Sequence, residues 1–553
     1  MKLSRFREIL GGVREDKTVI NFMGGESYLI NPLDTLKMIT ASSIFGEPSY
    51  YRSGGLGTKI QDARYKSCGL LEGYLFFDDS WDGLTTTEIM ENAIDEALAA
   101  DFEGTLRWAA ALRQNFYMRL NPQVIMVRAA LHPKRKEFTG EHPGLFDEIE
   151  RQVMSRGDDA LSQMAYFLYC NHGKQNMPSI LKRSLARKLG SLDAYEAAKY
   201  KNAEIGLRNA VRITHAHSAV IDEYMKTDGI TLAEQKKTWE NLRSEGMAWK
   251  DIFNNISMGH MALLRNLRGV FRENEDREFC MEYLGRLKDG VKRGKQFPFR
   301  YYSAYEAVER DNECAHRPLI LDALEACMDS SMENMPRLRG KTMCLSDNSG
   351  SAWGAIPSEY GTVRIAEIDN LSSVITAALA EEGYVGKFGN RLKIFPVSNR
   401  GQILRQAREI SHDRDKDVGG DTEGGIWEFF YNAISKKEHW DQIFIYSDQQ
   451  AGHGGLYGTP EQYRVYTEKG FSCNGNRKGM GRHINVFELI LEYRRKVNPK
   501  VNVFSIQTAG YNNVCVPEYC YRTCILYGWT GKELIFARQM IALWDDMEQK
   551  QKK

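Results

Sequence analysis

The stretch KTMCLSDNSGSA, residues 341–352, constrains the fold of this chain more than any other. Its short apolar run predicts one buried parallel strand, which ends in a tight turn that carries Asp347, Ser349 and Ser351. The carboxyl end of such a strand lies at the rim of an open α/β sheet, where ligands bind. Carboxylate and hydroxyl oxygens suit Mg²⁺, although an Asp-x-Ser-x-Ser sequence is more often an ordinary turn than a metal site. The stretch therefore predicts an α/β sheet with a candidate Mg²⁺ site at its rim.

The C-terminal third around this stretch alternates between short apolar segments and amphipathic ones. The segments are residues 365–379, 392–397, 402–410, 426–434, 442–446, 484–496, 501–506, 524–527 and 534–544. Strands that alternate with helices along the chain predict a doubly wound parallel sheet. Two further polar loops fit this pattern, because Thr422 stands before a predicted helix and Asp448 follows the predicted strand at 442–446. We expect both loops to reach the rim that carries Asp347.

Residues 1 to about 337 differ, because apolar residues recur there at spacings of three and four almost throughout. The predicted helices are residues 88–100, 105–112, 122–131, 144–154, 160–168, 178–189, 194–200, 232–245, 249–256, 261–271, 275–288 and 302–309. In 178–189, Leu181, Leu185 and Leu189 share one face, so Arg183 and Arg187 should face solvent. Many short helices with no strand run predict a solenoid of stacked helix pairs, with degenerate repeats of about 40 residues.

Composition excludes some classes of protein. The 553 residues, 42% hydrophobic and 27% charged, are typical of a globular chain of about two to four domains. The N-terminus lacks a secretory signal, and no window reaches about 18 uninterrupted apolar residues, so we expect a cytoplasmic protein without a membrane segment. Most of the ten cysteines are isolated in apolar runs, which favours reduced, buried thiols. The cluster of Cys515, Cys520 and Cys524 lacks the close pairs that zinc sites use.

Positive charge is concentrated in parts of the helical region, although the net charge of the chain is only +1. Residues 107–136 contain seven Lys or Arg and no acid, and residues 171–192 contain five more and no acid. This pattern has two interpretations. The cations form a surface that binds phosphates, or they form a solvated face whose acids lie on neighbouring helices. Arg265 likewise fits either RNA contact or a structural guanidinium between helix ends.

Five ordered motifs in the helical region resemble the TROVE module, which is named for telomerase, Ro and vault proteins. They are HGKQNMPSILKRSLARKLGSLDAYEAAKYK (172–201), RITHAHS (212–218), TWENLRSEG (238–246), MALLRNLRG (261–269) and FPFRYYSAY (297–305), preceded by YYRSGG (50–55) and RQNFYMRLNP (113–122). The order of polar loops in the C-terminal third resembles the von Willebrand factor type A domain and its metal-ion-dependent adhesion site. Over nearly all its length, the chain therefore resembles the Ro autoantigen family and its bacterial orthologues.

The resemblance implies a ring of HEAT-like helical repeats at residues 1–338, the TROVE domain, closed by a type A domain at residues 339–553. It implies that Asp347, Ser349 and Ser351 bind Mg²⁺ directly and that Thr422 and Asp448 contribute directly or through water. The family usually has Thr directly after a Gly pair, whereas Asp421 intervenes here. Metal loops of this type usually bind a carboxylate of a partner protein as the sixth ligand.

The resemblance also implies RNA as the partner. In the family, misfolded RNAs pass a single-stranded 3′ end into the positively charged hole of the ring, and small Y RNAs bind its outer face. We expect a monomeric ring that works with an exoribonuclease such as polynucleotide phosphorylase. Lys199 and His215 match outer-face positions, with Lys201 nearby, whereas Ala203 or Glu204 replaces a further basic residue. The residues expected to contact RNA are Arg113, Arg119, Arg128, Lys134, Arg135, Lys136, His172, Lys174, Arg183, Arg187, Lys199, Lys201, His215, Arg265 and Arg268.

The sequence offers little support for catalysis. It has no Gly-x-Ser-x-Gly elbow, no Walker loop, no His-Glu-x-x-His and no dinucleotide fingerprint after a strand. We therefore expect a binding protein and not an enzyme. Two alternatives stay open, namely a helical and type A scaffold that binds only proteins, and a metal-dependent nuclease or phosphatase.

Overall fold

The fold was analysed in a computed structural model of the chain. It describes residues 18–20, 26–29, 31–42, 86–200, 205–227, 239–294, 296, 298–333, 335–354, 363–399, 401–412, 418–420, 422–449, 473–474, 483–484, 486–508, 513–516, 522–527, 534, 537–538, 540–542 and 544–545. The motif at 50–55, and also Lys201, Asp421 and Cys520, lie outside these residues.

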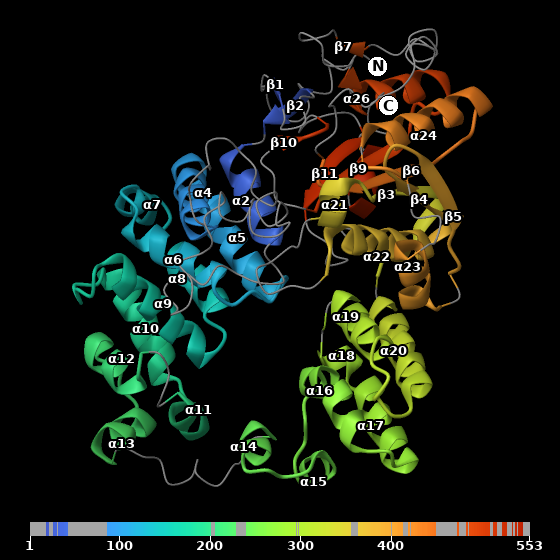
Figure 1. Ribbon diagram of the computed structural model, residues 1–553. Helices are drawn as coiled ribbons and strands as arrows, with labels where there is room; N and C mark the ends of the chain where they lie inside the picture. The colour runs from blue at the N-terminus through green and yellow to red at the C-terminus, as the bar shows by residue number, and fades with distance from the viewer. Residues whose placement is uncertain are drawn as a thin grey trace.

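Helices dominate the first 333 residues. They are α2 (Pro32–Ser42), α4 (Thr86–Ala100), α5 (Phe102–Gln114), α6 (Asn121–Leu131), α7 (Arg135–Glu141), α8 (Leu145–Val153), α9 (Gly157–Cys170), α10 (Ser179–Gly190), α11 (Ala194–Lys199), α12 (Leu207–Thr214), α13 (Ala219–Thr227), α14 (Trp239–Ser244), α15 (Trp249–Asn255), α16 (His260–Glu273), α17 (Arg277–Asp289), α18 (Val291–Gly294), α19 (Pro298–Glu309) and α20 (Arg317–Met332). Figure 1 shows that they descend one side of the molecule, pass along the bottom at α14 and α15, and ascend the other side. The predicted helical region is confirmed.

Apolar periodicity explains why these segments are helical. In α10, Leu181, Leu185 and Leu189 are fully buried, whereas Arg183 and Arg187 are exposed, as the sequence predicts. The helices α2, α7, α12, α13, α18 and α20 were not predicted, and the described part of the predicted helix 232–245 is the short α14. The prediction that this region contains no strands was wrong, because β1 (Thr18–Ile20) and β2 (Glu26–Leu29) pair with each other near the N-terminus.

The C-terminal part is an α/β domain built on a sheet of six strands. The strands are β3 (Leu338–Asp347), β4 (Ala380–Phe388), β5 (Leu392–Pro396), β6 (Gln442–Ser447), β9 (Asn502–Gln507) and β11 (Thr523–Tyr527), and their order is β11-β9-β6-β3-β4-β5. Neighbouring strands are parallel except β4 and β5, which form an antiparallel hairpin at the edge. The predicted doubly wound α/β sheet is confirmed, with one antiparallel strand, β5, added at its edge. β4 was missed because its sequence AEEGYVGKF lacks a continuous apolar run.

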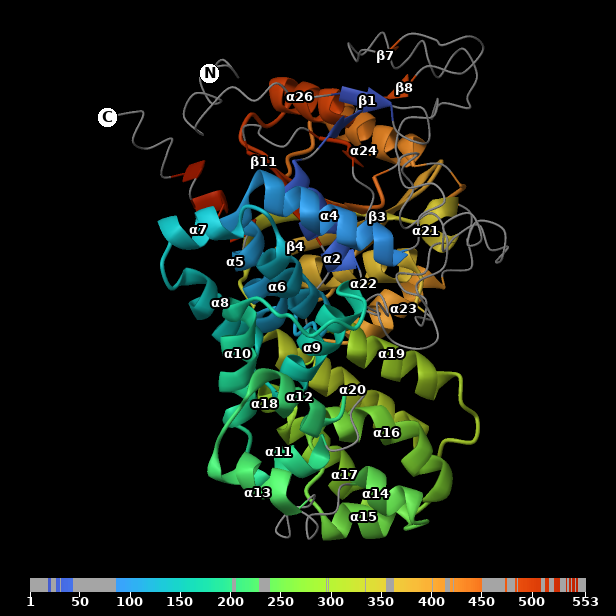
Figure 2. The same ribbon diagram turned by 90° about the vertical axis from the view of Figure 1, so that its left-hand side faces the viewer.

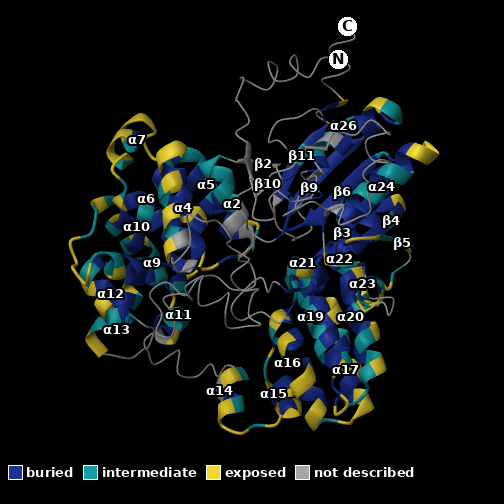
Figure 3. Ribbon diagram, turned by 45° about the horizontal axis from the view of Figure 1, so that its top comes forward, coloured by how far each residue is buried: buried dark blue, intermediate teal, exposed yellow. Residues whose placement is uncertain are grey.

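Helices cover both faces of this sheet. They are α21 (Gly350–Gly354), α22 (Ile365–Ala378), α23 (Ile403–Ser411), α24 (Glu423–Lys436) and α26 (Val486–Lys496). Successive residues of a strand point to opposite faces. Met343 and Leu345 accordingly pack in the core under α24 and α26, while Cys344 between them belongs to a second core. Figure 3 shows the central strands of this sheet largely buried, whereas the edge strand β5 is partly exposed.

Both ends of the helical array contact the α/β domain. At one end, α2 packs against β11, and at the other end α19 and α20 pack against α22 and α23. The short strand β10 (Asn513–Val514) also pairs with β2, so the N-terminal segment joins a sheet that crosses the predicted boundary at residue 338. In Figures 1 and 2 the α/β domain lies at the top and α14 and α15 lie at the opposite end. The chain thus follows a closed, ring-like course in which the α/β domain joins the two ends of the array.

Candidate functional site

Three loops meet at the carboxyl end of β3. β3 pairs in parallel with β6, so Asp347 and Asp448 follow at the same edge of the sheet. The Ser447 hydroxyl donates a hydrogen bond to the Asp347 carboxylate. The backbone N–H of Gly350 donates to the carbonyl of Gly420, at 2.9 Å, which brings the Gly-Gly loop before α24 beside the first loop. The sheet register therefore assembles the five residues that the sequence singled out.

The side chains at this edge form a buried polar site. Asp347 and Asp448 are fully buried, Ser349 and Thr422 are almost fully buried, and Ser351 is half-buried. The backbone N–H of Ser349 donates to Oδ1 of Asp347 at 2.8 Å, and the hydroxyls of Ser349 and Ser351 lie 3.1 Å apart. These are oxygen atoms, which are the ligands that Mg²⁺ prefers.

Electrostatics also favours a cation at this edge. Burial, and next the negative charge of Asp448, raise the pKa of the Asp347 carboxyl above its usual range. Among the described residues, Asp347 forms no ion pair with a Lys or Arg side chain. Buried carboxylates without a compensating cation are unfavourable, so the donor set fits a divalent ion. Such an ion would be held by Asp347, Ser349, Ser351, Thr422 and Asp448.

Two neighbouring residues of this site were not predicted from the sequence. Asp369 and Asn370 lie on α22, which is buried along its whole length. The Asn370 side chain accepts hydrogen bonds from Ser346 Oγ at 2.7 Å and from Asn348 Nδ2 at 2.9 Å, and it donates to Asn348 Oδ1 at 3.1 Å. These bonds fix α22 to the loop that carries Asp347. The signal in the sequence is the polar Asp-Asn pair within α22, because buried polar side chains need partners that only the packed structure reveals.

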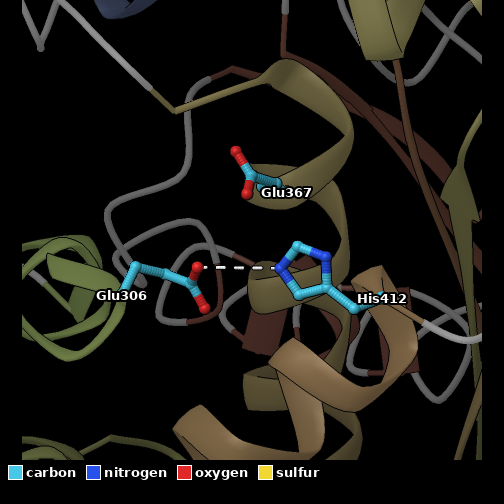
Figure 4. Close-up of side chains that lie close together, drawn as sticks. All are labelled: Glu306, Glu367 and His412. Atoms are coloured by element: carbon cyan, nitrogen blue, oxygen red, sulfur yellow. Dashed lines mark ion pairs between the residues drawn. The ribbon is translucent and has the colours of Figure 1, made fainter. Parts of the chain in front are cut away.

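A second group of possible ligands lies where the helical array meets the α/β domain. Figure 4 shows Glu306 of α19 facing His412, which follows α23, with Glu367 of α22 above them. The ligand atoms of the three side chains lie within 4.8 Å of one another. Glu306, however, already forms ion pairs with Arg310 at 2.6 Å and Arg408 at 3.1 Å. A metal ion there would have to compete with two guanidinium groups.

Several of the residues that were predicted to contact RNA instead form ion pairs with acids of neighbouring helices. Arg113 is buried and binds Asp159 at 2.8 Å, so this placement makes it a core residue and argues against RNA contact. Arg128 pairs with Asp95 and lies 3.0 Å from the hydroxyl of Tyr166. Arg119 and Arg187 pair with Asp158 and Asp147. For these four, acids of neighbouring helices lie beside the cations, as one of the two interpretations expects.

The cations around α7 have a third arrangement. The Lys134 ammonium donates to the carbonyl of Ala99 in the last turn of α4 at 2.5 Å, and Arg135 donates to the carbonyl of Ala130 in the last turn of α6 at 2.5 Å. Cations at helix C-termini satisfy free carbonyls and oppose the helix dipole. Lys136 is exposed and forms no ion pair with a described acid.

The other predicted contacts remain exposed. Arg268 is 55% exposed and lies 3.8 Å from Asp311. The following are exposed and form no ion pair with any described carboxylate: His172, Lys174, Arg183, Lys199, His215 and Arg265. His215 has a positive φ of 60° and ends α12. These six side chains, two histidines and four Lys or Arg, are here called the exposed basic set.

No structural zinc site is found at the described cysteines. Cys515 and Cys524 are free thiols, as are Cys170, Cys280, Cys314, Cys327 and Cys344. Burial raises the pKa of the Cys515 thiol to about 11, so it is held as a neutral thiol. The prediction of reduced thiols is confirmed for these cysteines. Among the described residues, no helix combines the length and apolar character needed to cross a membrane.

Comparison with known proteins gives two findings. A sequence model of the TROVE domain matches residues 230–317. The fold is similar to the crystal structure of the Deinococcus radiodurans Ro (RSR) protein, with a TM-score of 0.53 and 14% sequence identity, over 81% of this chain and 93% of that chain. A comparison with curated protein sequences gives no significant match. The chain therefore contains a TROVE sequence match and has the fold of a Ro protein, which confirms the predicted resemblance to the Ro family.

Proposed function

We propose that this chain is an RNA-binding protein of the Ro type. The TROVE match within a chain that has the Ro fold carries this proposal. The exposed basic set supports it, because its Lys and Arg side chains lie at the surface without a described acidic partner, and exposed cations attract phosphates and release counterions when they bind. Lys199 and His215 would bind a small Y-like RNA on the outer face, and other cations would receive the single-stranded 3′ end of a misfolded RNA in the ring. An exoribonuclease such as polynucleotide phosphorylase would then act on the RNA.

The proposal includes a divalent cation, Mg²⁺, at the carboxyl end of β3. Asp347, Ser349, Ser351, Thr422 and Asp448 would hold it. The ion would supply positive charge that compensates buried carboxylates, and it would not activate water. The protein would therefore act by binding and not by catalysis.

The first test compares two RNA duplexes of the same sequence, one blunt and one with a single-stranded 3′ tail of several nucleotides. We expect the tailed duplex to bind more tightly, because a cationic passage holds a flexible backbone more readily than an A-form duplex. Scrambling the tail should change the affinity little. Electrophoretic titration at fixed moderate salt measures both effects, since very low salt would let any basic surface bind both RNAs. Equal affinity for the blunt and tailed duplexes would contradict the passage.

A charge reversal separates RNA contact from general electrostatics. Arg183→Glu should weaken RNA binding and reduce the slope of log K against log salt by about one phosphate contact, because Arg183 is exposed and forms no ion pair with a described acid. Lys436→Glu is the control, since Lys436 is exposed on α24 of the α/β domain and, like Arg183, forms no ion pair with a described acid. An equal loss in both variants would show that net charge, and not the position of Arg183, governs binding.

The same experiments distinguish the alternatives. A scaffold that binds only proteins should show no salt-dependent RNA binding at all. A nuclease or phosphatase should show Mg²⁺-dependent turnover that Asp347→Ala abolishes.

A further inference from the structure

The cation site contains more buried negative charge than the five predicted residues supply. Asp369 on α22 is fully buried, as are Asp347 and Asp448. Its neighbour Asn370 is hydrogen bonded to Ser346 and Asn348, so this turn of α22 lies against the loop that follows β3. Thr508, which follows β9, completes the edge, because its backbone N–H donates to the carbonyl of Ser447 at 3.2 Å. Three carboxylates from three elements therefore gather at one edge.

The surroundings of Asp369 do not satisfy its carboxylate. No well-formed hydrogen bond reaches either oxygen of Asp369, and its one polar neighbour among the described side chains that lowers its pKa is the fully buried hydroxyl of Thr508. Among the described residues, Asp369 forms no ion pair. Burial, and next the charge of Asp347, raise the pKa of Asp369 above its usual range, while the adjacent Thr508 side chain partly offsets the shift. A buried carboxyl in this state is unfavourable unless a cation accompanies it.

We propose that Asp369 is a sixth protein residue of this cation site and supplies it with a third negative charge. The proposal rests on the Mg²⁺ site of the proposed function and goes beyond its five residues. A third carboxylate beside a divalent ion strengthens the attraction that holds the ion, so the natural chain should bind Mg²⁺ more tightly than the five residues alone would.

The test is cation binding by isosteric variants, measured by calorimetric titration of MgCl₂ and by the Mg²⁺-induced rise in Tm. Asp369→Asn should bind Mg²⁺ about tenfold to a hundredfold more weakly than the natural chain, as expected for loss of a supporting carboxylate. In the presence of a chelator, the Tm of Asp369→Asn should be no lower than that of the natural chain, because the substitution removes a buried charge. Asp322→Asn, an exposed change on α20, should leave Mg²⁺ binding unaltered.

The outcomes separate this inference from the site itself. If Asp369→Asn keeps the natural affinity while Asp347→Asn loses it, the five-residue site stands and the role of Asp369 is overturned. If the natural chain shows no Mg²⁺ binding and no shift in Tm, both the site and the inference fail.

Discussion

At the scale of single residues, the local partner of a charge decides its role. Arg113 and Arg183 both come from windows of sequence that contain no acid. Arg113 is buried against Asp159, whereas Arg183 is exposed and forms no ion pair with a described acid. The partner acids stand on other helices, so counting charge along the chain could not separate the two. Arg113 therefore stabilises the core of the array, and Arg183 is available for phosphates.

Glu150 is a buried acid whose ionisation opposes folding. It is fully buried on α8, and only one of its oxygens accepts a hydrogen bond, from Gln163 at 2.9 Å. Burial raises the pKa of Glu150 to about 7, and the Gln163 hydrogen bond only partly offsets this. The folded state therefore binds the proton more tightly than the unfolded state, so this contribution to stability is present at acid pH and is lost as pH rises through about 7.

We predict that Glu150→Gln is close to neutral at pH 5 and stabilising at pH 8. One pKa unit corresponds to about 1.4 kcal/mol, so the gain at pH 8 has an upper limit on the order of 3 kcal/mol. Urea unfolding at both pH values measures the difference, with the exposed Glu148→Gln on the same helix as control. A gain that is the same at pH 5 and pH 8 would contradict this account.

At the scale of elements, α23 depends on a residue of another domain for its first turn. The residue before it, Gln402, has a positive φ of 59° and makes no capping hydrogen bond with its side chain. The Glu325 carboxylate of α20 accepts from the backbone N–H of Leu404 at 3.1 Å and of Arg405 at 2.8 Å. A carboxylate there satisfies free N–H groups and interacts favourably with the helix dipole. The helical array thus caps a helix of the α/β domain.

We predict that Glu325→Ala lowers the free energy of unfolding by about 1 kcal/mol, the usual cost of a lost cap. Glu325→Gln should lower the free energy of unfolding by less than Glu325→Ala, because an amide oxygen still accepts one of the two hydrogen bonds. Asp322→Ala, an exposed change on the same helix, is the control. Chemical denaturation measures all three, and equal losses in the Ala and Gln variants would argue against the cap.

At the scale of the whole molecule, one hydrophobic core extends through both domains. It includes Leu36 of α2, Leu324 of α20, Leu404 of α23 and Phe444 of β6. The face of the sheet under α22 and α23 is therefore continuous with the core of the helical array, whereas the opposite face belongs to a second core that includes α24, α26 and the segment at Cys515 and Val516. A shared core couples the unfolding of the parts that contribute to it.

We predict a single cooperative thermal transition, with a calorimetric enthalpy equal to the van't Hoff enthalpy. Leu404→Ala, a truncation at the junction, should lower the Tm of that one transition, because buried Leu→Ala changes cost about 2–5 kcal/mol. Two separate transitions in the natural chain would show that the array and the α/β domain unfold independently.

The sequence by itself determined the elements that depend on local pattern. Periodic leucines placed α10 with Arg183 on its exposed face, and a short apolar run before an oxygen-rich turn placed β3 and the polar loop that follows it. The resemblance to the Ro family also followed from ordered motifs, and the TROVE match and the fold confirm it. These features were predictable because each is encoded within a few turns of helix or one strand.

Tertiary structure alone decided the features that join distant parts of the chain. The edge hairpin of β4 and β5, the pairing of β2 with β10 and the cap from Glu325 all involve partners far apart in sequence. The same holds for charge, since Asp159 removes Arg113 from the surface and α22 brings Asp369 to the cation loop. Burial and pairing are properties of the packed molecule, so no pattern along the chain could reveal which charges meet a partner and which remain for a ligand.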